Sequence, residues 1–125
     1  MILHSVPHLG PIDFEVFNEA KDILGDRFPS LLDRFQKDTC AILSSIEFAR
    51  ASNDYDGIRD AAHSLKSASF QMGARHMSHY ASAIEGALIS TPKLSTIQDE
   101  AELDSIIENL RQAFSTYQED VSSLI

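Results

Sequence analysis

Apolar residues recur at steps of three and four through almost the whole 125-residue chain, which is the spacing of amphipathic helices. The chain holds only five Gly and four Pro residues, a scarcity that favours long regular elements over a loop-rich or all-β design. We find no internal repeat and no low-complexity segment, and the length suits one compact domain. The sequence therefore predicts an all-α fold.

Breaks in the apolar pattern divide the chain into an extended N-terminal arm, residues 1–11, and a single helical domain, residues 12–125. The predicted helices cover residues 13–24, 28–51, 55–72 and 75–89, with a last helix that follows a possible capping box at Ser95 and Gln98. The apolar side of the first helix is predicted to contain Val16, Phe17, Ala20, Ile23 and Leu24. Four long helices joined by short loops predict an antiparallel up-down four-helix bundle, with the short N-terminal helix capping one end.

Charge and composition exclude several classes of function. The net charge of −9 repels phosphate backbones, so a nucleic-acid partner is not expected. No stretch approaches the roughly 20 apolar residues of a membrane span, and residues 1–10 do not resemble a signal peptide. The single cysteine, Cys40, indicates a reducing compartment such as the cytoplasm, and a buried or half-buried structural thiol is favoured over a reactive one. We expect a monomer, and the sequence suggests a free-standing protein, although a fragment of a larger multidomain protein also fits.

The helix predicted over residues 55–72 carries the candidate site. On a helical wheel, Ile58, Ala62, Leu65, Ser69 and Met72 define its core face, and His63 lies roughly 140° away, towards solvent. Ser67 and Phe70 lie on the same outer side, and Lys66 lies between that side and the core. An exposed histidine is ordinary in itself. Ser67, however, leaves the imidazole accessible, and Lys66 is near enough to meet negative charge placed on the ring, although a plain surface lysine fits that spacing equally well.

The segment from Ala62 to Ala74, AHSLKSASFQMGA, resembles the central motif of histidine phosphotransfer (HPt) domains. The family pattern is His-x-Leu-Lys-Gly, four small or polar residues, an apolar residue and Gly-Ala. The residues that match it in place are His63, Leu65, Lys66, Met72, Gly73 and Ala74. A looser resemblance extends from about Ile12 to Leu88.

This resemblance implies that His63 is phosphorylated, through Nε2, and relays the phosphoryl group between receiver domains of hybrid histidine kinases and response regulators. Lys66 would neutralise the phosphoryl group. Glu85 stands where family members often have a Gln or Glu that orients the ring, although an exposed glutamate fits its place on the wheel nearly as well. No cofactor is expected on this chain, because in the family the receiver supplies the Mg²⁺ and the acidic pocket.

Two residues depart from the family pattern. Ser67 replaces the usual Gly and keeps the surface small, whereas Phe70 replaces a small residue with an aromatic ring. That ring is either a docking contact or is folded back onto a neighbouring helix. The receiver is expected to dock at the end of the bundle around His63, on Ser67 and Phe70 together with Phe17, Phe28 and Leu31 of the first two helices.

Other classes of function remain as alternatives. The sequence contains no Gly-rich phosphate loop, so the chain is not expected to be an enzyme that makes phosphohistidine from ATP. A metal-binding bundle is suggested only by His76 and His79, and both side chains are expected to point outward. The sequence also lacks the inward-facing Glu-x-x-His motifs of di-iron bundles. A non-phosphorylated adaptor bundle is the remaining alternative, and phosphoryl uptake separates the three.

Overall fold

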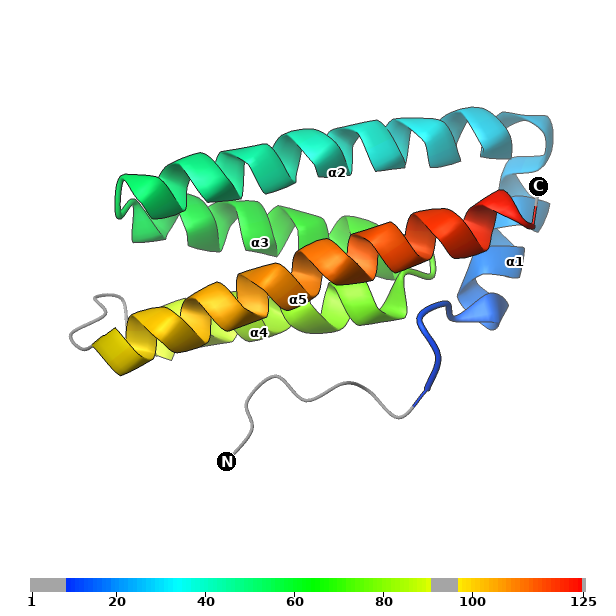
Figure 1. The fold of residues 1–125 in the computed structure, drawn as a ribbon. Coiled ribbons are helices and arrows are strands. Elements are labelled where there is room, and N and C mark those ends of the chain that lie inside the picture. Colours follow the sequence, from blue (N-terminus) through cyan, green and yellow to red (C-terminus); the bar gives the residue numbers. More distant parts are fainter. Residues whose placement is uncertain (1–8, 91–96, 125) are drawn as a thin grey trace.

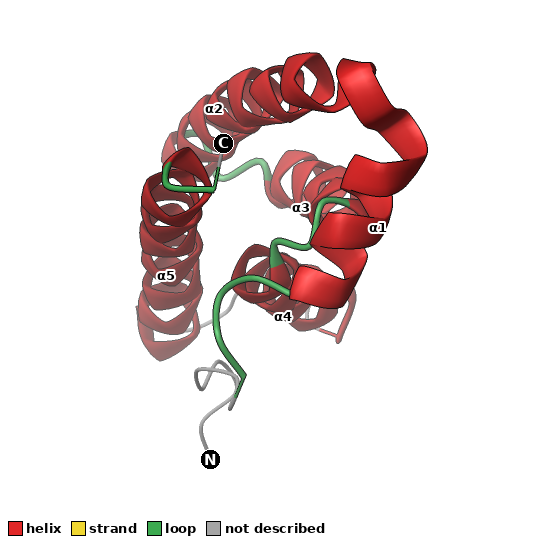
Figure 2. Cartoon of the chain, turned by 90° about the vertical axis from the view of Figure 1, so that its right-hand side faces the viewer, coloured by secondary structure: helices red, strands yellow, loops and turns green. Residues whose placement is uncertain are grey.

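A computed structural model of the chain describes residues 9–90 and 97–124. Its elements are α1 (Phe14–Leu24), a 3-10 turn η1 (Gly25–Arg27), α2 (Phe28–Ala51), α3 (Tyr55–Gln71), α4 (Arg75–Ser90) and α5 (Ile97–Ser122). The four long helices lie alongside one another with successive helices antiparallel, and α1 lies across the end where α2 begins and α5 ends (Figures 1 and 2). The predicted all-α four-helix bundle with a short N-terminal helix is thus confirmed. Residues 1–8 of the arm predicted over residues 1–11, and Ser95 of the predicted capping box, lie outside the described residues.

Local chemistry sets the helix ends close to the predicted positions. Asp13 caps α1 by accepting a hydrogen bond from the Val16 backbone N–H at 3.2 Å, and Asp54 caps α3 through the Gly57 N–H at 3.0 Å. At the other end of α3, Gly73 has φ +69°, a conformation that side chains with a Cβ seldom adopt. These signals act within a few residues, which explains why the sequence alone predicts the ends well.

The core runs along the axis of the bundle between the four long helices. On α3, four residues of the predicted core face, Ile58, Ala62, Leu65 and Ser69, are fully buried. The fifth, Met72, caps the end of α3 and is partly buried against the core. Tyr117 on α5 donates a hydrogen bond from its hydroxyl to the Met72 carbonyl at 2.8 Å and so ties α5 to the end of α3. The other large side chains that are almost fully buried are Phe17, Phe28, Leu32, Ile46, Met77, Ile84, Leu88, Ile106 and Leu110.

The expected burial of Ile23 and of Cys40 is not found. Ile23 is 70% exposed because it lies about 120° from Phe17 on the α1 wheel, and α1 covers the bundle only with the Phe17 side. Cys40 is exposed rather than buried. Its neighbour Thr39 takes the inward position on α2, where the Thr39 hydroxyl donates to the Phe35 carbonyl at 2.8 Å. In the described part of the chain, none of the helices has the length and apolar character of a membrane span.

Candidate functional site

His63 lies at the middle of α3 and points out of the bundle. Its side chain is 65% exposed, while Ala62 and Leu65 on either side of it are fully buried. These two core residues fix the rotation of α3, so the imidazole is held at the surface without being part of the packing. The outward position predicted from the helical wheel is therefore confirmed.

Glu85 reaches His63 from the neighbouring helix α4. Ile84 and Leu88, which are almost fully buried, set the rotation of α4 and leave the Glu85 side chain only 12% exposed against α3. One carboxylate oxygen of Glu85, Oε2, lies 2.5 Å from Nδ1 of His63. The other oxygen, Oε1, forms an ion pair with Nζ of Lys66. Of the two interpretations that the sequence leaves open for Glu85, the structure therefore supports the one in which it turns towards α3.

The electrostatics of this cluster assign the proton on the histidine ring. The hydrogen bond from Lys66 lowers the pKa of the Glu85 carboxyl group below its usual value; burial opposes this effect, and the hydrogen bond to His63 adds to it. Glu85 is therefore a carboxylate, which can only accept hydrogen bonds. Nδ1 must then be the protonated nitrogen that donates to Glu85, and in the neutral ring Nε2 keeps a free lone pair. The arrangement presents an exposed nitrogen nucleophile of defined orientation.

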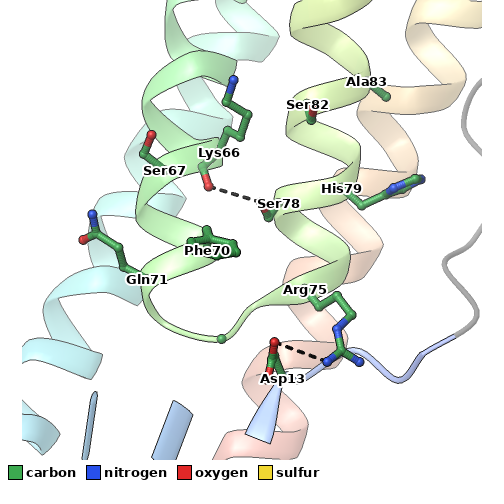
Figure 3. A pocket seen from close by; sticks show the side chains of 11 residues that line it. Asp13, Lys66, Ser67, Phe70, Gln71, Arg75, Ser78, His79, Ser82 and Ala83 are labelled. Atoms are coloured by element: carbon green, nitrogen blue, oxygen red, sulfur yellow. Dashed lines mark hydrogen bonds and ion pairs between the residues drawn. The ribbon is translucent and has the colours of Figure 1, made fainter. Parts of the chain in front are cut away.

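A groove between α3 and α4 continues from this cluster towards Gly73 (Figure 3). Lys66, Ser67 and Phe70 line it from α3, and Ser78 and Ser82 line it from α4. Phe70 is 64% exposed, so its ring is not buried under a neighbouring helix. The groove thus offers an aromatic wall next to small polar side chains, within two turns of His63.

Gly73 closes this groove at the turn between α3 and α4. The Asp13 N–H donates to the Gly73 carbonyl at 2.8 Å, and the Arg75 N–H donates to the Pro11 carbonyl at 3.0 Å. A Cβ on Gly73 would lie only 2.8 Å from the Asp13 carbonyl oxygen and 3.0 Å from Cβ of Phe17. Gly73 is therefore required both for its positive φ and for the close approach of the segment that leads into α1.

The docking surface predicted from the sequence needs correction. Phe17 and Phe28 are each 1% exposed and contact each other edge to face with ring centroids 5.1 Å apart, so neither can touch a partner. Periodicity shows that they belong to an apolar face but does not show that α1 and α2 bury those faces against each other. Leu31 is 38% exposed and remains accessible. Because His63 is at the middle of α3, the accessible surface around it is the side of the bundle and not its end.

Arg59 is a residue near the site that the sequence analysis missed. It lies one turn before His63 on α3, its side chain is 33% exposed, and it pairs with Asp56 at 3.2 Å and Asp60 at 3.7 Å. The spacing of four residues between Arg59 and His63 was the signal that could have identified it.

The two histidines of α4 form no metal site in this structure. Nε2 of His76 donates to the Leu9 carbonyl at 2.8 Å, and Nε2 of His79 is buried, contrary to the outward position expected for it. Across residues 9–90 and 97–124, no three His, Cys, Asp or Glu side chains come close enough together to hold a metal ion.

Comparisons with known proteins bear directly on this site. The sequence model of the Hpt domain family matches residues 30–121. Among solved structures, the chain is similar to the crystal structure of histidine-containing phosphotransfer protein B from Pseudomonas aeruginosa, with 25% sequence identity and a TM-score of 0.65 over 93% of this chain and 98% of that one. No curated protein sequence matches. The matched range contains His63, Lys66 and Glu85.

Proposed function

This chain belongs to the Hpt domain family of histidine phosphotransfer proteins, and from that premise we propose that it carries a phosphoryl group on Nε2 of His63 between the aspartates of receiver domains. The observation that carries the proposal is the 2.5 Å contact between Nδ1 of His63 and the Glu85 carboxylate. It leaves the lone pair on Nε2 free on a side chain that is 65% exposed. A nucleophile that must enter a partner's active site needs both properties.

Phosphoryl transfer to His63 exchanges one bond to phosphorus for another. The Nε2 lone pair attacks the phosphorus of the acyl phosphate on the receiver aspartate, and a nitrogen–phosphorus bond forms as the bond from phosphorus to the aspartate oxygen breaks. The aspartate leaves as a carboxylate with that electron pair. The proton stays on Nδ1, so the phosphorylated ring is cationic and Glu85 stabilises it through the same hydrogen bond. Reversal of these steps delivers the phosphoryl group to the next receiver.

Lys66 and Glu85 have different roles in this proposal. Glu85 is a positioning residue that fixes the tautomer and the orientation of the ring. Lys66 lies one turn after His63, and its ammonium group offsets part of the negative charge that the phosphoryl group brings. Proteins of the Hpt family are phosphocarriers rather than kinases, so positioning supplies most of the catalysis here. We propose that the receiver contributes the Mg²⁺ and the acidic pocket, and that this chain needs no cofactor.

The docking surface in this proposal is the side of the bundle around α3. Ser67 keeps the surface next to His63 small, so the imidazole can enter a recessed pocket. Phe70, 64% exposed, and Leu31, 38% exposed, supply apolar contacts further out. Both lie towards the end where α3 finishes and α2 begins (Figure 1). We expect the chain to act as a monomer that binds one receiver at a time.

The experiment that tests the proposal is phosphoryl uptake from a phosphorylated receiver domain. We expect acid-labile, base-stable phosphate on the wild-type chain and none on His63→Gln. The helicity of His63→Gln should equal that of the wild type, because an exposed side chain adds little to packing. His76→Gln is the matched control and should be labelled normally. Wild-type labelling of His63→Gln would refute the role of His63, and absence of labelling on the wild-type chain would favour the non-phosphorylated adaptor.

A further inference from the structure

Four side chains form a continuous stripe along the outer side of α3. Arg59, His63, Lys66 and Phe70 follow one another at steps of four, three and four, so they share one face of the helix. Each directly follows a fully buried residue of the core face, which shows that the stripe runs beside the core along the whole helix. Arg59 and Lys66 therefore flank His63, one turn before it and one turn after it.

In the unphosphorylated chain, the ammonium group of Lys66 is already neutralised by an ion pair. It pairs with Glu85, and the two side chains are only 34% and 12% exposed. This pair carries no net charge, whereas a phosphoryl group brings up to two negative charges. The cationic ring of phosphorylated His63 offsets one of these charges, so up to one negative charge remains without compensation.

Arg59 is held far less tightly. Its partners Asp56 and Asp60 are both 78% exposed, and surface ion pairs of this kind exchange readily with water. Asp56 and Asp60 would also repel a phosphoryl group on His63, because both carry negative charge. On this turn of α3, the guanidinium of Arg59 is the cation that can offset that repulsion. A guanidinium also presents two parallel N–H donors that match two phosphoryl oxygens.

The orientation of the His63 ring favours binding of its phosphoryl group at the turn of α3 that carries Arg59. Side chains on a helix lean towards its N-terminus, so the ring of His63 covers the turn that carries Arg59. Nδ1 is held on the α4 side by Glu85, and Nε2 lies on the other side of the ring, away from that carboxylate. A phosphoryl group on Nε2 is therefore directed away from the Glu85 carboxylate.

We infer that Arg59 is a phosphoryl-binding residue, which breaks its pairs with Asp56 and Asp60 and binds the phosphoryl oxygens once His63 is phosphorylated. This inference rests on the proposed phosphorylation of His63. In the phosphorylated chain, two cations would then act on the phosphoryl group. Lys66 stays paired with Glu85, whereas Arg59 leaves its solvent-exposed partners.

The test uses the full chain phosphorylated by a small donor, phosphoramidate, so that no receiver is involved. The proton affinity of the phosphoryl group is read from its ³¹P chemical shift as a function of pH. Arg59→Gln should raise that proton affinity about sixfold, the size expected for loss of one unit charge roughly 4 Å away in water. Arg59→Lys keeps the charge and should restore most of the effect. Arg34→Gln is the matched control, because Arg34 also forms an exposed pair, with Asp38 at 3.8 Å, on a different helix, and it should behave as wild type.

A second readout is the equilibrium ratio of phosphorylated His63 to phosphorylated receiver in dilute solution, which does not depend on how the two proteins dock. Arg59→Gln should lower this ratio about sixfold through the same lost charge. Unchanged values of both quantities in Arg59→Gln, or an equal change in Arg34→Gln, would overturn the role of Arg59 while leaving phosphorylation of His63 in place. If the wild-type chain takes no phosphate from either donor, the proposed function fails, and this inference fails with it.

Discussion

Replacing Glu85 with alanine removes the one carboxylate that holds both His63 and Lys66. A hydrogen bond to a charged group contributes roughly 1.5–3 kcal/mol where water is excluded. Here the partners are 65% and 34% exposed, so water takes over much of each contact. We therefore expect Glu85→Ala to lower the free energy of unfolding by only about 1 kcal/mol. For a chain of this length, the melting temperature should fall by about 4 °C.

The effect of Glu85→Ala on phosphoryl transfer should be larger than its effect on stability. Without the acceptor, the neutral ring of His63 can carry its proton on either nitrogen and can rotate, and only the tautomer protonated on Nδ1 leaves the Nε2 lone pair free. In metal sites, loss of the residue that orients a histidine ligand typically lowers metal affinity or activity by at least about tenfold. We expect a similar tenfold decrease in the transfer rate from a phosphorylated receiver.

Two measurements check this prediction. The ¹⁵N chemical shifts of the His63 ring report which nitrogen is protonated, and quenched-flow mixing with a phosphorylated receiver gives the transfer rate. Glu108→Ala is a suitable control, because Glu108 is also ion-paired, with Arg111 at 3.4 Å, but lies on α5. If Glu85→Ala keeps the wild-type tautomer and the wild-type rate, then Glu85 does not position the ring and the reasoning is wrong.

The same carboxylate predicts a pH dependence of stability. Because Lys66, and secondarily His63, holds the pKa of folded Glu85 below the usual value of 4.5, the folded state binds the Glu85 proton less readily than the unfolded state. The stabilisation that Glu85 provides is thus complete above about pH 4.5 and is lost as the pH falls through its folded pKa. Urea denaturation should show a wild-type advantage over Glu85→Gln that shrinks below pH 4.5. An advantage that stays constant down to pH 2.5, about two units below that value, would contradict this.

Three further substitutions test other parts of the site. Lys66→Ala should slow transfer onto His63 by about fivefold at low salt and by less at higher salt, because the lost interaction is electrostatic. If Lys66→Ala transfers at the wild-type rate at both salt concentrations, Lys66 does not have this role. Ser67→Arg should block exchange with a receiver while a small phosphodonor still labels His63 slowly, and receiver exchange at the wild-type rate would place the docking surface elsewhere. Gly73→Ala should lower the free energy of unfolding in urea by about 2–3 kcal/mol, since it adds strain at φ +69° and a Cβ 2.8 Å from the Asp13 carbonyl oxygen. A loss below about 0.5 kcal/mol would show that the segment leading into α1 can move away at little cost.

The sequence by itself determined the helices, their ends and the exposure of His63. Asp54 and Gly73 act on backbone groups within a few residues of themselves, so their effect does not depend on the rest of the fold. The outward position of His63 follows from the spacing of Ala62 and Leu65, because a helix with one apolar side must bury that side. The motif around His63 was also sufficient to indicate the family that the comparison then showed.

Only the tertiary structure decided which faces meet. Periodicity marked Phe17 and Phe28 as apolar, but their mutual burial depends on how α1 lies across the end of the bundle. The contact of Glu85 with His63 depends on the rotation and height of α4 against α3, which is set by packing along both helices at once. Local backbone preferences extend over about one helical turn, whereas the pairing of side chains 22 residues apart results from the packing of the whole core, and no local pattern encodes it.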